Sequence, residues 1–516
     1  MSDLRPAAVI VLAAGEGTRM KSKTPKVLHT IGGRTLVAHA ISAARGTEPT
    51  YLEVVIRHQR DRVAAHVEQV DPEAIVIDQD EIPGTGRAVE CALSALPDDL
   101  AGTVLVTYGD VPLLTAAVLR GLLADHARTQ SAVTLITATL DDPTGYGRVL
   151  RDADGGVAEV IEQKDATDEQ RAIHEVNSGI YAFDVAVLRE ALTQVGTDNA
   201  QGEKYLTDVV GIARARGLRV TPYLVDDLWQ TEGVNDKVQL ARLGAELNRR
   251  IVEQVMRDGA IVIDPATTWI DAGVSVGRDT VLQPNTQLLG ATSIGAECVI
   301  GPDTTLEDTE VADGASVIRT QAQLAEIGPG ATVGPFSFLR PGTKLGAKGK
   351  IGGFVETKNA DIGPEAKVPH LTYCGDATIG EGANIGAGTI FANFDGLTKS
   401  HTEVGPWSFV GSDSVIVAPR TIGAGSYVAA GSAVVSDVGP GQLAVTRARQ
   451  RNIDGWVARR RAGTRTEKAA QAAAAADAEE ALSTEAGAVL EGDRLEAGRP
   501  GGSEPPPPPA EETREA

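Results

Sequence analysis

Two stretches of this 516-residue chain hold residue types whose spacing suits chemistry, and the first suits phosphate binding. It follows the apolar run of residues 9–12 and reads Gly15-x-Gly17-x-Arg19, with Lys26 further on. Glycines after a strand let backbone N–H groups approach a phosphate closely, and Arg19 and Lys26 add fixed positive charge. No Gly-Lys-Ser/Thr follows, so this is not a Walker A motif, and Met20 replaces the third glycine of the dinucleotide fingerprint. Taken alone, the two glycines also fit an ordinary turn.

An acidic residue closes a second apolar run of the same half of the chain. Residues 103–107 lead into Tyr108-Gly109-Asp110. A carboxylate at the end of a buried strand is well placed to hold Mg²⁺, which prefers oxygen ligands and retains waters. The alternative is a turn aspartate, which is common after strands.

The second stretch suits proton transfer. His370 and Tyr373 lie close together, with Lys358 and Arg340 upstream. An ordinary imidazole has a pKa of about 6.5, which suits a general base at neutral pH. The two cations suit a sugar phosphate. The competing interpretation is a surface histidine beside a solvated basic face.

The elements that must position the first stretch alternate between apolar strands and amphipathic helices over residues 7–230. Expected strands are 9–12, 53–56, 74–78, 103–107 and 133–138, and expected helices are 35–44, 61–70, 87–95 and 116–127. This alternation predicts an α/β Rossmann-like domain, with a mostly parallel sheet covered on both faces. Ligands should lie at the carboxyl ends of the strands.

The elements that position the second stretch repeat every six residues. The aliphatic runs are Ile270, Val276, Leu282, Leu288, Ile294, Ile300, Leu306; Ile327, Val333, Leu339, Leu345, Ile351; and Val404, Val410, Ile416, Ile422, Val428, Val434. A period of six fits a chain that turns a corner every six residues and stacks short parallel strands, which is a β-solenoid. The period slips after Ile351, after Val368 and before Val404, and such slips are expected to mark insertions.

The remaining segments complete the expected organisation. Leu240, Leu243, Leu247, Ile251 and Val255 form one apolar stripe, which predicts a connecting helix over 236–256. From residue 462 the chain is rich in Ala and Glu and ends in a run of prolines, so we expect a disordered tail, although 467–482 is compatible with helix. The predicted domains are 1–235, the linker 236–257, 258–461 and the tail 462–516.

Composition limits the partners and the compartment. The 48 basic and 70 acidic residues leave a net charge of −22, which argues against nucleic acid or an anionic membrane as the partner. The three cysteines are far apart without a C-x-x-C pair, which indicates a reducing compartment. The first residues lack the features of a signal peptide, so cytoplasm is the expected location.

The full set of motifs resembles a known family. The N-terminal set, which continues with Gly84-Thr85-Gly86, Gly145-Tyr146-Gly147-Arg148, Asn177-Ser178-Gly179 and Gly233-Val234-Asn235, resembles the sugar-1-phosphate nucleotidyltransferases. The repeat resembles the left-handed parallel β-helix (hexapeptide repeat) acyltransferases. Together, over about residues 7–460, they resemble the bifunctional bacterial N-acetylglucosamine-1-phosphate uridylyltransferases and glucosamine-1-phosphate acetyltransferases.

This resemblance implies roles in the N-terminal half. UTP and the sugar nucleotide are bound by Leu12, Ala13, Ala14, Gly15, Lys26, Gln79, Gly84, Thr85, Tyr108, Gly109, Asp110, Gly147, Glu162, Asn177 and Asn235. Within that set, Gln79, Gly84 and Thr85 contact the uracil, and Gly147, Glu162 and Asn177 hold the sugar. Asp110 and Asn235 ligate Mg²⁺, while Arg19 and Lys26 assist uridylyl transfer from UTP, which releases pyrophosphate. Glu16 is unusual in a phosphate loop and is expected to point to solvent.

The resemblance also implies roles on the solenoid. His370 is the catalytic base that accepts the amine proton of glucosamine 1-phosphate during acetyl transfer from acetyl-CoA. Arg340, Lys358, Tyr373 and Asn384 bind the sugar phosphate, and acetyl-CoA contacts Ala387, Asn393, Phe394, Ser412, Ala430 and Arg447. Phe394 stands where the family usually has Tyr, so one hydroxyl contact is lost. A homotrimer is implied, with acyl-transfer sites between subunits.

Two other interpretations remain at this point. One is a single-activity sugar-1-phosphate nucleotidyltransferase whose solenoid only assembles and regulates the enzyme, and the set of His370, Lys358 and Arg340 argues against it. The other is a non-enzymatic scaffold, against which the intact Arg19, Lys26 and Asp110 argue. The leading interpretation is a two-site enzyme that carries out both reactions and so makes UDP-N-acetylglucosamine, a precursor of peptidoglycan.

Overall fold

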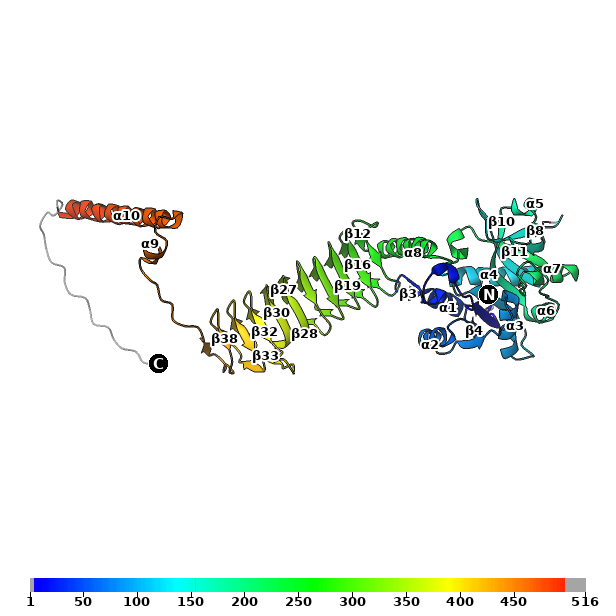
Figure 1. Cartoon of the computed structure of the whole chain (residues 1–516), viewed down its shortest axis with the longest axis horizontal. Coiled ribbons are helices and arrows are strands. Elements are labelled where there is room, and N and C mark those ends of the chain that lie inside the picture. The colour runs from blue at the N-terminus through cyan, green and yellow to red at the C-terminus, as the bar shows by residue number, and fades with distance from the viewer. Residues whose placement is uncertain (1–3, 154, 497–516) are drawn as a thin grey trace, which may run out of the picture. The chain divides into compact units, whose positions relative to one another are not determined.

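The computed structural model describes residues 4–153 and 155–496. The chain divides into two compact units, of which the first ends at Thr446 and the second begins at Arg447. The first unit holds an α/β domain, a long helix and a β-helix (Figure 1). Within the described residues, every helix is too short or too polar to cross a membrane.

A twisted sheet forms the centre of the α/β domain. Its strand order is β11-β7-β10-β6-β1-β4-β5, and β8 and β9 extend it beside β10. The bounds are β1 Ala8–Leu12, β4 Tyr51–Ile56, β5 Ile75–Asp78, β6 Thr103–Tyr108, β7 Val133–Thr139, β8 Gly147–Arg151, β9 Val157–Ile161, β10 Glu175–Asp184 and β11 Val220–Leu224; β2 Thr30–Ile31 and β3 Arg34–Thr35 form a separate pair. Strand β10 is antiparallel to β6 and β7, whereas β1 is parallel to both β4 and β6. The prediction of a mostly parallel sheet is confirmed.

Helices cover both faces of this sheet, because its strands are apolar on both sides. One buried cluster joins the sheet to α3, α6 and α7, and the other joins it to α1, α2 and α4. The bounds are α1 Leu36–Arg45, α2 Arg60–Val70, α3 Thr85–Ala95, α4 Ala116–Thr129, α5 Asp168–Arg171, α6 Val185–Leu192 and α7 Asp208–Ala215, with 3-10 turns η1 Thr18–Met20, η2 Lys26–Leu28 and η3 Leu228–Thr231.

The β-helix stacks short parallel strands into an 11-stranded and a 17-stranded sheet. The first contains β12 Ile261–Val262, β15 Val281–Leu282, β18 Val299–Ile300, β21 Ser316–Val317, β24 Thr332–Val333, β27 Lys350–Gly353, β29 Lys367–His370, β31 Asn384–Ile385, β34 Phe409–Val410, β37 Tyr427–Val428 and β39 Leu443–Ala444. The second contains β13 Trp269–Ile270, β14 Ser275–Val276, β16 Thr286–Leu289, β17 Ser293–Ile294, β19 Thr304–Glu307, β20 Glu310–Val311, β22 Thr320–Gln323, β23 Glu326–Ile327, β25 Ser337–Leu339, β26 Lys344–Leu345, β28 Glu356–Ile362, β30 Tyr373–Ile379, β32 Ile390–Ala392, β33 Thr402–Val404, β35 Val415–Val417, β36 Arg420–Ile422 and β38 Ala433–Val434. The predicted solenoid is confirmed.

The aliphatic residues that recur every six positions form one continuous core. Apart from the partly buried Val276, every member of the three runs is buried in a single cluster. Successive coils lie about 4.8 Å apart, so these side chains pack directly on one another.

The slips in the repeat have two different causes. Thr357 and Cys374 are buried inward residues, and the next inward residue follows each of them after five positions in place of six. At these two places one residue is missing from the repeat, and strands β28 and β30 each run through the corner without a break. The expectation that these two slips mark insertions is therefore wrong. The slip before Val404 is an insertion, the loop 393–401, which protrudes between β32 and β33.

Helix α8 and the C-terminal region complete the chain. Helix α8 (Lys237–Arg257) covers the predicted connecting stretch, and the Asp236 side chain caps its first turn. In the second unit, α9 spans Trp456–Arg460 and α10 spans Arg465–Glu496. Helix α10 includes the stretch 467–482 that was expected to be compatible with helix, and its many alanines favour this conformation because alanine is the best helix former. The run Pro505–Pro509 lies outside the described residues.

Candidate functional site

The phosphate loop packs closely around one lysine. Gly17 has φ +67°, and a Cβ there would lie 2.5 Å from the Cβ of Lys26. Any other residue at position 17 would strain the backbone and displace Lys26. The loop connects β1 to η1, so its backbone lies at the carboxyl edge of the sheet, where α/β proteins bind ligands.

A pocket of about 540 Å³ opens beside this loop. It brings together ten residues that the sequence analysis assigned to nucleotide binding: Leu12, Ala13, Ala14, Gly15, Lys26, Gln79, Gly84, Thr85, Tyr108 and Asp110. Its lining also includes residues that were not assigned to binding: Glu16, Val27, Arg57, His58, Pro83, Ala88 and Glu203. Arg57 and His58 directly follow β4, so the rule that ligands lie at carboxyl strand ends could have found them. Glu16 is solvent-exposed, as expected, yet it also lines the pocket.

The residues assigned to the sugar lie next to the pocket, around Tyr108. A Cβ on Gly147 would lie 3.5 Å from a Glu162 carboxylate oxygen, and one on Gly179 would meet the Tyr108 ring. The Asn177 side chain donates to the Tyr181 hydroxyl at 2.6 Å and accepts from the Gly179 N–H at 3.0 Å. Burial raises the pKa of Glu162.

Gly109 connects the carboxyl ends of strands β1 and β6 at the edge of the nucleotide pocket. Its N–H donates to the Leu12 carbonyl at 2.9 Å, which ties the end of β6 to the end of β1.

The two residues assigned to Mg²⁺ each accept from a cation. The Lys26 ammonium pairs with the Asp110 carboxylate, and Arg19 Nη2 donates to Asn235 Oδ1 at 2.7 Å. The Val234 N–H donates to the Asp110 carbonyl at 2.9 Å, so the segments that carry Asp110 and Asn235 are adjacent. One carboxylate and one amide oxygen fit Mg²⁺, which keeps several waters and takes phosphate oxygens. Among the described residues, this site included, no cluster of three or more His, Cys, Asp or Glu side chains could hold a metal.

One corner of the β-helix aligns the proposed base with three residues assigned to acetyl-CoA. The Gly388 N–H donates to the His370 carbonyl, the Asp413 N–H to the Ala387 carbonyl and the Gly431 N–H to the Ser412 carbonyl, at 2.8 to 3.1 Å. His370, Ala387, Ser412 and Ala430 therefore lie in one column of successive coils. His370 and Ser412 are exposed to solvent.

A second cluster joins the cations to the insertion loop. Asn393 donates to Asp376 Oδ2 at 2.5 Å and to the Tyr373 hydroxyl at 3.4 Å. Contact with Lys399 lowers the pKa of Lys358, because two ammonium groups approach one another. Lys399 was not assigned to a site from the sequence, although its place in the insertion before Val404 was a usable signal.

Two assigned residues, Asn384 and Phe394, make none of these contacts, whereas Arg340 lies one coil before Lys358 and its charge also lowers the pKa of Lys358. Asn384 lies in β31 of the 11-stranded sheet, whereas Lys358 and Tyr373 lie in the 17-stranded sheet. Arg340 donates to Glu356 Oε1 at 3.0 Å, one coil from Tyr373. Phe394 is 57% exposed, and Arg447 begins the second unit. The β-helix residues of one chain therefore form an open surface.

Comparison with known proteins covers both halves of the chain. Residues 9–173 match the MobA-like NTP transferase domain family. The chain is 59% identical to the bifunctional protein GlmU of Pseudarthrobacter chlorophenolicus, over 93% of this chain and 98% of that protein. It is 58% identical to that of Kineococcus radiotolerans (91% and 95%) and 57% identical to that of Corynebacterium efficiens (91% and 97%).

Proposed function

Since this chain belongs to the family of bifunctional GlmU proteins, it is a bifunctional enzyme of UDP-N-acetylglucosamine synthesis, and we propose that its two sites divide the two reactions between the α/β domain and the β-helix. The α/β domain transfers a uridylyl group from UTP to N-acetylglucosamine 1-phosphate. The β-helix acetylates glucosamine 1-phosphate with acetyl-CoA. The support is the pocket around residues 12–15 for the first reaction and the His370 column for the second.

In uridylyl transfer the protein positions two anions and stabilises charge. A phosphate oxygen of the sugar attacks the α-phosphorus in line, and pyrophosphate leaves. Lys26 and Arg19, which otherwise pair with Asp110 and Asn235, turn to the phosphates, and this frees two oxygen ligands. Asp110 and Asn235 would hold Mg²⁺, which would supply positive charge beside the phosphates. Orientation and charge stabilisation account for most of the catalysis in such reactions.

In acetyl transfer His370 accepts the proton of the 2-amino group as the nitrogen attacks the thioester carbonyl. The C–N bond forms, the C–S bond breaks, and the CoA sulfur leaves. Arg340, Lys358 and Lys399 bind the sugar phosphate, since a dianion between Lys358 and Lys399 relieves the repulsion of their ammonium groups. The acetyl-CoA chain follows the column of Ala387, Ser412 and Ala430.

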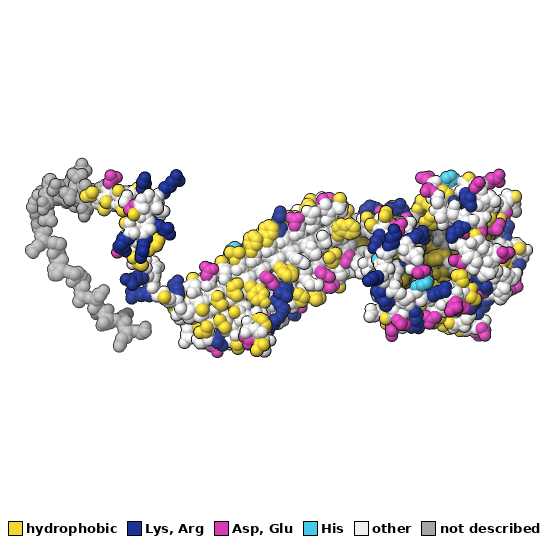
Figure 2. All heavy atoms as spheres, in the orientation of Figure 1, with side chains coloured by type: hydrophobic (Ala, Val, Ile, Leu, Met, Phe, Trp, Pro, Cys, Tyr) yellow, Lys and Arg dark blue, Asp and Glu magenta, His cyan; other side chains and the backbone are white. Residues whose placement is uncertain are grey.

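Assembly as a homotrimer would close the open acetyl-transfer site. Beside the His370 column, the exposed side chains of Phe336, Phe354 and Leu371 form an apolar ladder, with Phe336 and Phe354 stacked at 5.3 Å between ring centroids. Figure 2 shows apolar side chains gathered over the C-terminal half of the β-helix. Apolar patches of this kind mark protein interfaces, and a neighbouring subunit could bring its Asn384 to Tyr373.

We assign both reactions to the cytoplasm, with small molecules as the partners. Cys298 and Cys374 are unpaired and buried in the β-helix core, which suits a reducing compartment. The net charge of −22 disfavours nucleic acid and anionic membranes as partners.

Substitutions in each site test whether the two reactions take place at separate sites. His370→Ala should reduce acetylation by about a hundredfold or more, as expected for loss of a general base, and leave uridylylation at the wild-type rate. Asp110→Ala should do the reverse. Mass spectrometry of products from glucosamine 1-phosphate, acetyl-CoA, UTP and Mg²⁺ measures both reactions.

The matched control is His401→Ala, at the other histidine of the β-helix, which bonds to Thr378. It should retain both activities. Parallel loss of both activities in His370→Ala would refute separate sites, and uridylylation that persists in EDTA would refute the metal role of Asp110 and Asn235.

A further inference from the structure

The segment from Asp227 to Asn235 brings one proposed metal ligand to the nucleotide site, yet it has little structure of its own. It lies between β11 and α8, and its only regular element is the 3-10 turn η3. A connecting segment without sheet partners must be held by side chains if it is to present a ligand accurately.

Helix α8 fastens this segment at three points. Arg250 binds Asp227 near its start. Arg242 pairs with Glu232 and stacks over the Trp229 ring, 5.2 Å from its centroid. At the far end, the Asn235 N–H donates to Gln239 Oε1 at 2.8 Å.

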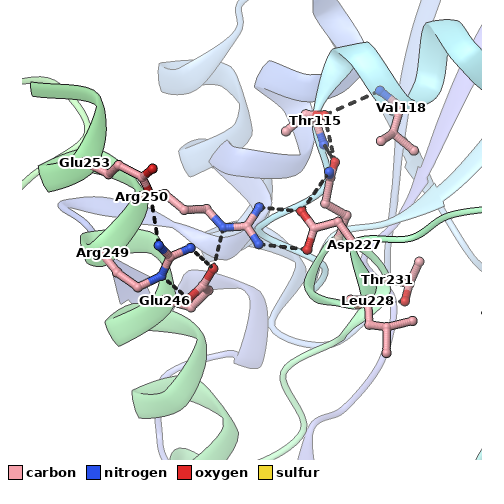
Figure 3. Close-up of polar contacts among 10 residues, drawn as sticks. Thr115, Val118, Asp227, Leu228, Thr231, Glu246, Arg249, Arg250 and Glu253 are labelled. Atoms are coloured by element: carbon pink, nitrogen blue, oxygen red, sulfur yellow. Dashed lines mark hydrogen bonds and ion pairs between the residues drawn. The ribbon is translucent and has the colours of Figure 1, made fainter. Parts of the chain in front are cut away.

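The Arg250 contact has the most constrained geometry of the three (Figure 3). Its Nη1 and Nη2 bind the two Asp227 oxygens at 2.7 and 2.9 Å, while its Nε donates to Glu246 Oε1 at 2.7 Å. Glu246 is only 9% exposed and is also held by Arg249. Because the planar guanidinium is bound on both edges, it fixes where Asp227 lies relative to α8 and also neutralises its charge.

The same network reaches the segment of the other proposed ligand. Gln230 Nε2 donates to Asp227 Oδ2 at 3.0 Å, and Gln230 Oε1 accepts from the N–H and hydroxyl of Thr115 at 3.2 and 2.7 Å. Thr115 follows Asp110 along the same stretch of chain, and the Val234 N–H donates to the Asp110 carbonyl. The network that starts at Arg250 therefore touches both stretches that carry the ligands.

We infer that Arg250 is a positioning residue for uridylyl transfer, which through Asp227 holds residues 227–235 so that Asn235 stands beside Asp110. This inference rests on the proposed assignment of uridylyl transfer to the α/β domain. Arg250 does not line the nucleotide pocket. An ion pair that served stability alone would leave the metal requirement of the reaction unchanged.

The test compares three full-length variants with wild type. Arg250→Met keeps the length of the side chain and removes its charge, and Arg250→Lys keeps the charge and removes the two-pronged contact. Arg257→Met is the matched control on the same helix, because Arg257 pairs with Glu253 and not with residues 227–235. The first readout is amide hydrogen exchange of peptides from 228–235 in EDTA. The second is the Mg²⁺ concentration for half-maximal uridylylation, with acetylation measured on the same samples.

Arg250→Met should exchange faster over 228–235 and need roughly tenfold more Mg²⁺, the lower end of the effect of outer-shell changes on metal affinity. Arg250→Lys should fall between Arg250→Met and wild type, and Arg257→Met should match wild type, all with unchanged acetylation. Unchanged exchange, or a lower maximal rate at an unchanged Mg²⁺ requirement, would overturn the inference. A wild-type chain that acetylates but does not uridylylate would instead overturn the proposed function of the α/β domain.

Discussion

Glu53 shows how a single buried carboxyl group is tolerated inside a nucleotide-binding sheet. It lies in the middle of β4, is fully buried, and neither of its side-chain oxygens has a hydrogen-bond partner among the described residues. Burial raises its pKa to about 8, against the opposing influence of the Arg189 charge. The group is therefore mostly protonated, and so mostly neutral, in the folded protein at pH 7.

Glu53→Gln should stabilise the protein at high pH and not at low pH. In the unfolded chain Glu53 ionises near pH 4.3, about its ordinary pKa, so between that pH and about 8 the folded state binds more protons and stability falls as pH rises. Glutamine removes this cost. The free energy of unfolding of the variant should exceed that of wild type at pH 8 by on the order of 1 to 3 kcal/mol, and the gain should vanish near pH 4. Urea unfolding followed by circular dichroism measures it, and an equal gain at both pH values would contradict the explanation.

At the scale of elements, the β-helix builds its site from irregularities in a regular stack. Its strands are mostly two to four residues long, and none could persist without the coils above and below. The loop 393–401 interrupts this stack and carries Lys399 toward Lys358, while Asn393 at its start holds Asp376 and Tyr373. The loop thus joins Lys399, the cation that we propose binds the sugar phosphate, to the coil that carries Tyr373.

Lys399→Ala should weaken binding of glucosamine 1-phosphate. Because its charge contacts a phosphate that does not react, we expect KM for the sugar phosphate to rise by about tenfold with kcat nearly unchanged. Steady-state acetylation kinetics measure both constants. Lys344→Ala, which breaks a surface pair with Glu326, is the control and should behave as wild type. A fall in kcat at constant KM would argue against a binding role.

At the scale of the whole molecule, the two proposed sites differ in whether one chain is enough to enclose them. The nucleotide pocket is lined by residues of one chain, whereas His370 and its column face solvent. The exposed Phe336, Phe354 and Leu371 lie in the coils that precede and include that column. Acetyl transfer should therefore depend on assembly, and uridylyl transfer should not.

Phe354→Asp should separate the subunits and abolish acetylation while uridylylation continues. Phe354 is 64% exposed, so an aspartate costs a single chain little, whereas a buried, unpaired charge in an interface is strongly unfavourable. Sedimentation velocity gives the mass of the assembly. Val238→Asp, at a 78% exposed position of α8, is the control and should keep the wild-type mass. A Phe354→Asp protein of wild-type mass would refute the proposed interface.

The sequence by itself determined the architecture, because both halves rest on local periodicity. Inward residues such as Leu288 and Val410 recur at the corner spacing of a coil, and strands such as 9–12 are apolar throughout. Ten residues of the nucleotide pocket were named from the sequence through the family resemblance, whereas seven others that line it, among them Arg57 and His58, were not. Tertiary structure alone decided the rest: the pairing of Lys26 with Asp110, the approach of Lys399 to Lys358, and the hold of Arg250 on Asp227. Each of these contacts joins residues that are distant in sequence or separated by an irregular loop. No local sequence pattern indicates which side chains will be in contact after the chain has folded.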